Sequence, residues 1–122
     1  MQKFLIVMLG AGFGGGFRYL VANFVQKATN PFFPFGTLAV NFLGSFILGI
    51  LIFAFDDKEL LSANMKLLIG VGFCGGFTTF STFSFETFSL IKNTQFLLAG
   101  VNIFANILTT LFAVYLAHII TK

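Results

Sequence analysis

The sequence predicts an all-α membrane protein with four transmembrane helices, and two observations support this. Only 9% of the 122 residues are charged and 57% are hydrophobic, whereas a soluble domain is about 25% charged. Four apolar runs also each exceed the roughly 20 residues that a helix needs to cross a bilayer. The runs are Phe4–Val25, Phe35–Phe55, Leu67–Ile91 and Phe96–Ile120.

The charged and turn-forming residues gather in the breaks between the runs, at 26–34, 56–66 and 92–95. The net charge of +3 is modest, and its lysines flank the bilayer instead of forming a patch, which argues against a nucleic-acid partner. We therefore expect a single membrane domain, residues 1–122. The first run is not expected to be a cleaved signal peptide, because it is long and contains Arg18.

The first run contains several glycines and one charged residue, Arg18. Gly10 and Gly14, like Gly12 and Gly16, have the four-residue spacing that lets helices approach closely in lipid. Arg18 lies deep enough in the run to be costly unless it pairs or reaches an interface. Two roles stay open for it: a structural tether on backbone carbonyls, or a positive charge that attracts anions.

The second run carries a small, polar helix face, on which Thr37, Asn41, Ser45 and Gly49 recur every four residues. Asn41 is the strongest donor on that face. It is either a link between helices or a donor to an anion in a polar conduit.

The third run is the one that the chain is organised around. Gly75 and Gly76, followed by Thr78 and Thr79, predict a helix break at mid-span, at the sequence CGGF. A break there leaves backbone carbonyls and amides unpaired, and such groups can form a buried ion site. The lone Cys74 is expected to be a small apolar filler.

Aromatic and polar residues alternate after the break. Phe80 and Phe83 are i, i+3 neighbours, with Ser81, Thr82 and Glu86 around them. A phenylalanine stripe can simply face lipid, but the polar setting favours a path, and the positive edge of a phenyl ring can meet an anion. Glu86 would repel an anion, so we expect it to be protonated or hydrogen-bonded to hydroxyls.

The fourth run places Asn102, Asn106 and Thr110 on one face, as a stripe of donors or as paired links between helices. His118 is expected at the membrane surface. Across the four runs, donors without strong positive charge suit the passage of an anion that must not be held tightly.

Four spans place both termini on one side of the membrane. That side carries four lysines and the other carries two, or three cations if Arg18 reaches it, a bias too weak to fix one orientation. Four short helices also enclose little space. An antiparallel homodimer with its axis near Gly75–Thr78 would complete a conduit and double the carbonyls there.

The sequences GTLAVNFLGSFILG (36–49) and GFCGGFTTFSTFSFE (72–86), with the glycine-rich run that ends in Arg18–Tyr19, resemble the Fluc/CrcB family of fluoride channels. The resemblance covers all four spans. It implies a bacterial inner-membrane channel, not an enzyme, that lets toxic fluoride leave the cell passively. It also implies an antiparallel, dual-topology homodimer with two pores.

The resemblance further implies roles for individual residues. Phe80 and Phe83 match the pore phenylalanines, and Asn41 matches the amide donor to fluoride. The carbonyls of Gly75 and Thr78, from both subunits, match the ligands of a central structural Na⁺. The positions beside the path are Ser81, Thr82, Glu86, Asn102, Asn106 and Thr110.

Two other functions fit a small four-span protein. A multidrug exporter needs a membrane-buried acid and aromatic walls, and only Glu86 offers such an acid. In a non-transporting assembly subunit, the glycines and polar residues would serve packing alone.

Overall fold

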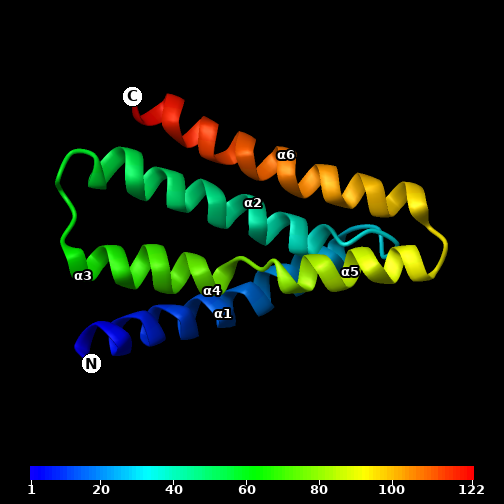
Figure 1. Ribbon diagram of the computed structural model, residues 1–122, viewed down its shortest axis with the longest axis horizontal. Coiled ribbons are helices and arrows are strands. Elements are labelled where there is room, and N and C mark those ends of the chain that lie inside the picture. The colour runs from blue at the N-terminus through cyan, green and yellow to red at the C-terminus, as the bar shows by residue number, and fades with distance from the viewer.

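The computed structural model describes all residues, Met1–Lys122, as four long helical spans that run antiparallel to their neighbours in sequence (Figure 1). This confirms the predicted all-helical fold. Both termini lie at the same end of the bundle (Figure 1). The spans that are long and apolar enough to cross a membrane are Gln2–Ala28, Phe35–Asp56, Ala63–Lys92 and Phe96–Thr121.

Two of the spans are single α-helices, and two are composite. The first and fourth spans are α1 (Gln2–Ala28) and α6 (Phe96–Thr121). The second is α2 (Phe35–Ile50), which continues as the π-helical segment η1 (Leu51–Asp56). The third consists of α3 (Ala63–Met65), the π-helical segment η2 (Lys66–Cys74), α4 (Gly75–Phe77) and, after a break, α5 (Ser81–Lys92).

The second span lies at the centre of the arrangement. In Figure 1, α2 lies between α6 on one side and the third span on the other. The helix α6 packs along α2 and also contacts α5, while α1 packs mainly against η2, α4 and α2. The third span is therefore held on both sides of its break, by α1 before it and by α6 after it.

Glycine contacts bring α1 against the third span. A Cβ on Gly10 or Gly14 would collide with a backbone oxygen of the third span, and a Cβ on Gly76 would lie 2.5 Å from the carbonyl oxygen of Ala11. The predicted close approach at Gly10 and Gly14 is thus confirmed, with glycine on both helices. The second predicted pair differs, because a Cβ on Gly12 or Gly16 would meet nothing within 4 Å.

The third span breaks at 78–80, just after the expected position at CGGF. Gly75 and Gly76 remain helical, because the packing of Gly76 against α1 offsets its low helix propensity. Thr78 is extended, with φ −91° and ψ 162°, and its hydroxyl donates to the carbonyl of Cys74 at 2.9 Å. The helix restarts where the hydroxyl of Thr79 accepts the N–H of Thr82 at 3.1 Å.

We predict that Gly14→Ala lowers the free energy of unfolding by about 1–3 kcal/mol, because the added methyl group separates two helix backbones. Gly12→Ala is the matched control on the same helix. It should be neutral, or stabilising by up to about 1 kcal/mol, through the better helix propensity of alanine. Denaturant unfolding of the purified protein in detergent, followed by circular dichroism, measures both. Equal effects of the two substitutions would contradict the close packing of α1 against the third span at Gly14.

Candidate functional site at the helix break

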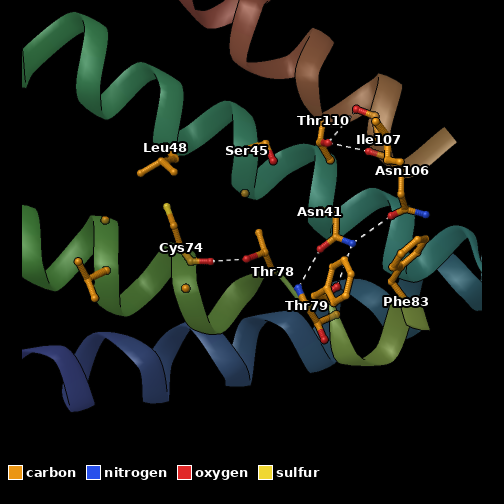
Figure 2. A pocket seen from close by; sticks show the side chains of 15 residues that line it. Asn41, Ser45, Leu48, Cys74, Thr78, Thr79, Phe83, Asn106, Ile107 and Thr110 are labelled. Atoms are coloured by element: carbon orange, nitrogen blue, oxygen red, sulfur yellow. Dashed lines mark hydrogen bonds between the residues drawn. The ribbon is translucent and has the colours of Figure 1, made fainter. Parts of the chain in front are cut away.

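A cavity of about 470 Å³ lies at the break, between α2, the third span and α6 (Figure 2). None of its 15 lining residues carries a charge. The cavity brings together seven of the residues singled out from the sequence: Asn41, Gly75, Thr78, Phe80, Phe83, Asn106 and Thr110. Their assembly from three spans makes this cavity the candidate functional site.

Asn41 pairs with the backbone of Thr79, one of the residues at the break. Its Oδ1 accepts the N–H of Thr79 at 2.8 Å, and its Nδ2 donates to the carbonyl of Thr79 at 3.1 Å. The same Nδ2 donates to Oδ1 of Asn106 at 3.0 Å. Both amide hydrogens are therefore in use, so this geometry favours the role of a link between helices over that of a free donor.

A chain of side-chain hydrogen bonds continues from Asn106 (Figure 2 shows its first bond, from Asn41). Asn106 donates to Oδ1 of Asn102 at 3.0 Å, and Asn102 donates to the hydroxyl of Thr87 at 2.9 Å. Thr87 in turn donates to the carbonyl of Phe83 at 2.8 Å. All donors point in the same direction, so each bond polarises the next. The chain ties α6 to α5 and fixes the backbone at Phe83.

Phe80 and Phe83 lie at the start of α5, beside the cavity. Their ring centroids are 5.4 Å apart and the ring planes are inclined at 56°. Phe83 is half-buried, while 78% of Phe80 is exposed. One wall of the cavity is therefore incomplete in a single copy of the chain.

Two helix ends of opposite polarity meet at the break. The N–H groups of Phe80 and Phe83, at the start of α5, have no acceptor in the protein, and they lie at the positive end of a 12-residue helix. The carbonyls of Gly75 and Thr78, at the end of α4, accept no hydrogen bond. Free N–H groups can bind an anion and free carbonyls a hard cation.

Arg18 contacts the backbone at the same break. Its Nε donates to the carbonyl of Gly76 at 3.0 Å, one of the carbonyls that the end of α4 would otherwise leave free. Its side chain makes no ion pair, since Lys66 and Asp56 form the one salt bridge of the chain. Of the two roles left open for Arg18, the tether on a backbone carbonyl is thus present. Arg18 and Thr82 line a second hollow of about 280 Å³, on the side of α1.

Three further residues singled out from the sequence do not line the main cavity. Glu86 is half-buried, and its Oε1 is buried without a hydrogen-bond partner. Ser81 is exposed, with its hydroxyl 3.3 Å from that of Thr79. Asn102 is 1% exposed and lies between α5 and α6.

The structure adds one residue to the candidate site. Ser45 lies on α2 one turn after Asn41 and lines the cavity. The four-residue spacing of Thr37, Asn41 and Ser45 in the sequence already placed Ser45 on the same helix face as Asn41. The predicted helix break indicated that backbone groups would be free there, but which of them remain unpaired depends on the fold.

The chain is similar to known membrane proteins over almost its whole length. Residues 5–118 match the family described as "CrcB-like protein, Camphor Resistance (CrcB)". A protein of Shewanella oneidensis and one of Shewanella sp. strain ANA-3 are each 46% identical to it over 118 residues, and one of Shewanella baltica strain OS185 is 45% identical. The alignments cover 97% of this chain and 94% of each relative. All three are named "Fluoride-specific ion channel FluC".

We predict that Asn41→Asp destabilises the fold by at least about 2 kcal/mol. The carboxylate still accepts from the N–H of Thr79, but it cannot donate to the oxygens of Thr79 and Asn106, which then face a negative charge. Hydrogen–deuterium exchange at the Thr79 amide and denaturant unfolding measure the effect. Asn23→Asp is the control, because the side chain of Asn23 makes no hydrogen bond in the protein. It should change stability by less than about 0.5 kcal/mol.

Proposed function

The chain belongs to the CrcB-like family, and from this membership and the geometry at the break we propose that it is a fluoride-selective channel. It lets cytoplasmic fluoride leave the cell passively, through the inner membrane of a bacterium, and so lowers the toxicity of the ion. Its relatives are named as ion channels and not as enzymes.

The observation that carries the proposal is the uncharged cavity at the break. It lies near the middle of the third span, where the surroundings are apolar, and its lining combines hydroxyls and amides with aromatic and aliphatic side chains. A fixed positive charge there would hold an anion too tightly for rapid release. The lining also contains no acid that could exchange a proton for cargo, which favours a passive channel over a proton-coupled exporter.

The energetic requirement explains why a broken helix suits this task. Moving a small ion from water into a medium of low dielectric costs on the order of 20 kcal/mol in the idealised case. A hydrogen bond in such a medium contributes about 4–6 kcal/mol. Several donors must therefore act together. The free N–H groups of Phe80 and Phe83 supply donors that an unbroken helix would use internally.

The rings of Phe80 and Phe83 supply weaker contacts. The edge of a phenyl ring carries partial positive charge, so the ion can pass along the two edges without being trapped. Asn41 and Asn106 hold the backbone around these rings, through hydrogen bonds of 3.0–3.1 Å. We propose that Ser81, Thr82, Glu86, Asn102 and Thr110 act beside this path and not as its narrowest part. Arg18 anchors the end of α4.

We further propose that two copies form an antiparallel homodimer with two pores. The cavity of about 470 Å³ is far larger than a halide ion, and 78% of Phe80 is exposed. A second copy would close this open wall. The carbonyls of Gly75 and Thr78 from both copies would together give four oxygen ligands for a structural Na⁺. Such an ion would offset the negative ends of the two α4 segments and hold the copies together.

We expect liposomes that contain the purified protein to release fluoride, measured with a fluoride electrode, and to retain chloride. Fluoride concentrates its charge in a small radius, so it gains most from close N–H and O–H donors. Liposomes without protein are the control. Chloride release at a similar rate would remove the claim of selectivity, and retention of both ions would refute the channel.

We expect Phe80→Ile and Phe83→Ile each to slow fluoride release by about 2- to 10-fold, the loss of one ring-edge contact of roughly 0.5–1.5 kcal/mol. Phe85→Ile is the matched control, because Phe85 is 72% exposed on the same helix and does not line the cavity. Size-exclusion chromatography with light scattering checks that the oligomer is unchanged. If all three variants conduct like the parent protein, the ring edges are not part of the path.

A further inference from the structure

Most side-chain donors around the cavity are already in use. The amide of Asn41 donates to the carbonyl of Thr79 and to Oδ1 of Asn106. The amide of Asn106 donates to the carbonyl and to Oδ1 of Asn102. The hydroxyls of Thr78 and Thr110 donate to backbone carbonyls of their own helical segments, at 2.9 and 2.6 Å. The hydroxyl of Thr79 donates to that of Thr82 at 3.2 Å. An anion that entered the cavity would have to break one of these bonds to use them.

Ser45 is the exception. Its hydroxyl makes no hydrogen bond in the protein, although the residue is half-buried and lines the cavity. A hydroxyl in an apolar helix normally donates to the carbonyl four residues earlier. Six threonines of this chain do so, at 2.6–2.9 Å: Thr29, Thr78, Thr87, Thr109, Thr110 and Thr121. Figure 2 shows Ser45 between Leu48 and Asn41 along α2, on the wall of the cavity.

We propose that the hydroxyl of Ser45 is a direct ligand of fluoride in this cavity, an inference that rests on the proposed channel function. A hydrogen bond to an anion is roughly twice as strong as one between neutral groups, so an unused hydroxyl in an apolar setting is a strong donor to a halide. Ser45 thus takes the side-chain role that the family resemblance implied for Asn41. The N–H groups of Phe80 and Phe83 complete the set from the opposite wall.

Ser45→Ala removes the donor and little else, and alanine favours a helix. The loss of a hydrogen bond to a charged group corresponds to about a 10-fold or greater effect. We therefore expect fluoride release from liposomes to slow by about 10-fold. Ser45→Cys keeps a weak donor of similar shape, so it should restore part of the rate. Ser89→Ala is the matched control, because Ser89 also lacks a hydrogen-bond partner but does not line the cavity.

Fluoride binding is measured separately from conduction, through the rise in melting temperature of the detergent-solubilised protein in sodium fluoride relative to sodium chloride. The rise should be smaller in Ser45→Ala than in the parent protein and unchanged in Ser89→Ala. If the parent protein conducts fluoride and Ser45→Ala matches it in both rate and melting, the Ser45 proposal is overturned while the channel stands. Equal losses in the two alanine variants would also overturn it. If the parent protein neither conducts nor responds to fluoride, both proposals fall.

Discussion

A helix that breaks inside a membrane must find partners for the backbone groups it releases, because lipid offers none. In this protein Asn41 meets that requirement for Thr79, by pairing with both its N–H and its carbonyl. The series of hydrogen bonds that runs from Asn106 through Asn102 to Thr87 then fixes the orientation of Asn41. The broken helix can exist because a polar network on two neighbouring spans supports it.

This arrangement divides the polar residues into two groups. Asparagines and most threonines hold the fold, since their donors are used within the protein. The free groups beside the break include the hydroxyl of Ser45, the N–H groups of Phe80 and Phe83, and the carbonyls of Gly75 and Thr78. We propose that the free groups serve ions. A polar residue beside a cavity is therefore not by itself an ion ligand. It can donate to an ion only if its hydrogens are not already used within the protein.

Much of the fold could be predicted from the sequence, because membrane spans follow from composition and length. The four spans, the close approach at Gly10 and Gly14, and the tether of Arg18 could be expected. The break was expected slightly too early, since helix propensity alone does not reveal that Gly76 packs against α1. The site was harder to predict. Spacing placed Asn41 and Ser45 on one face, but only the packing shows which of them has a spare hydrogen.

The seam between α1 and the third span has a consequence for how the chain tolerates change. Gly10 meets Gly72, Gly14 meets the backbone of Phe73 and Phe77, and Gly76 meets the backbone of Ala11 and Gly15. In an ordinary core, an enlarged residue can be accommodated by trimming its neighbour. At these contacts the neighbouring atoms belong to the backbone, so no side chain there can be made smaller. A larger residue on one helix therefore cannot be offset by a smaller residue on the other. Either both helices keep their glycines, or the two backbones must move apart.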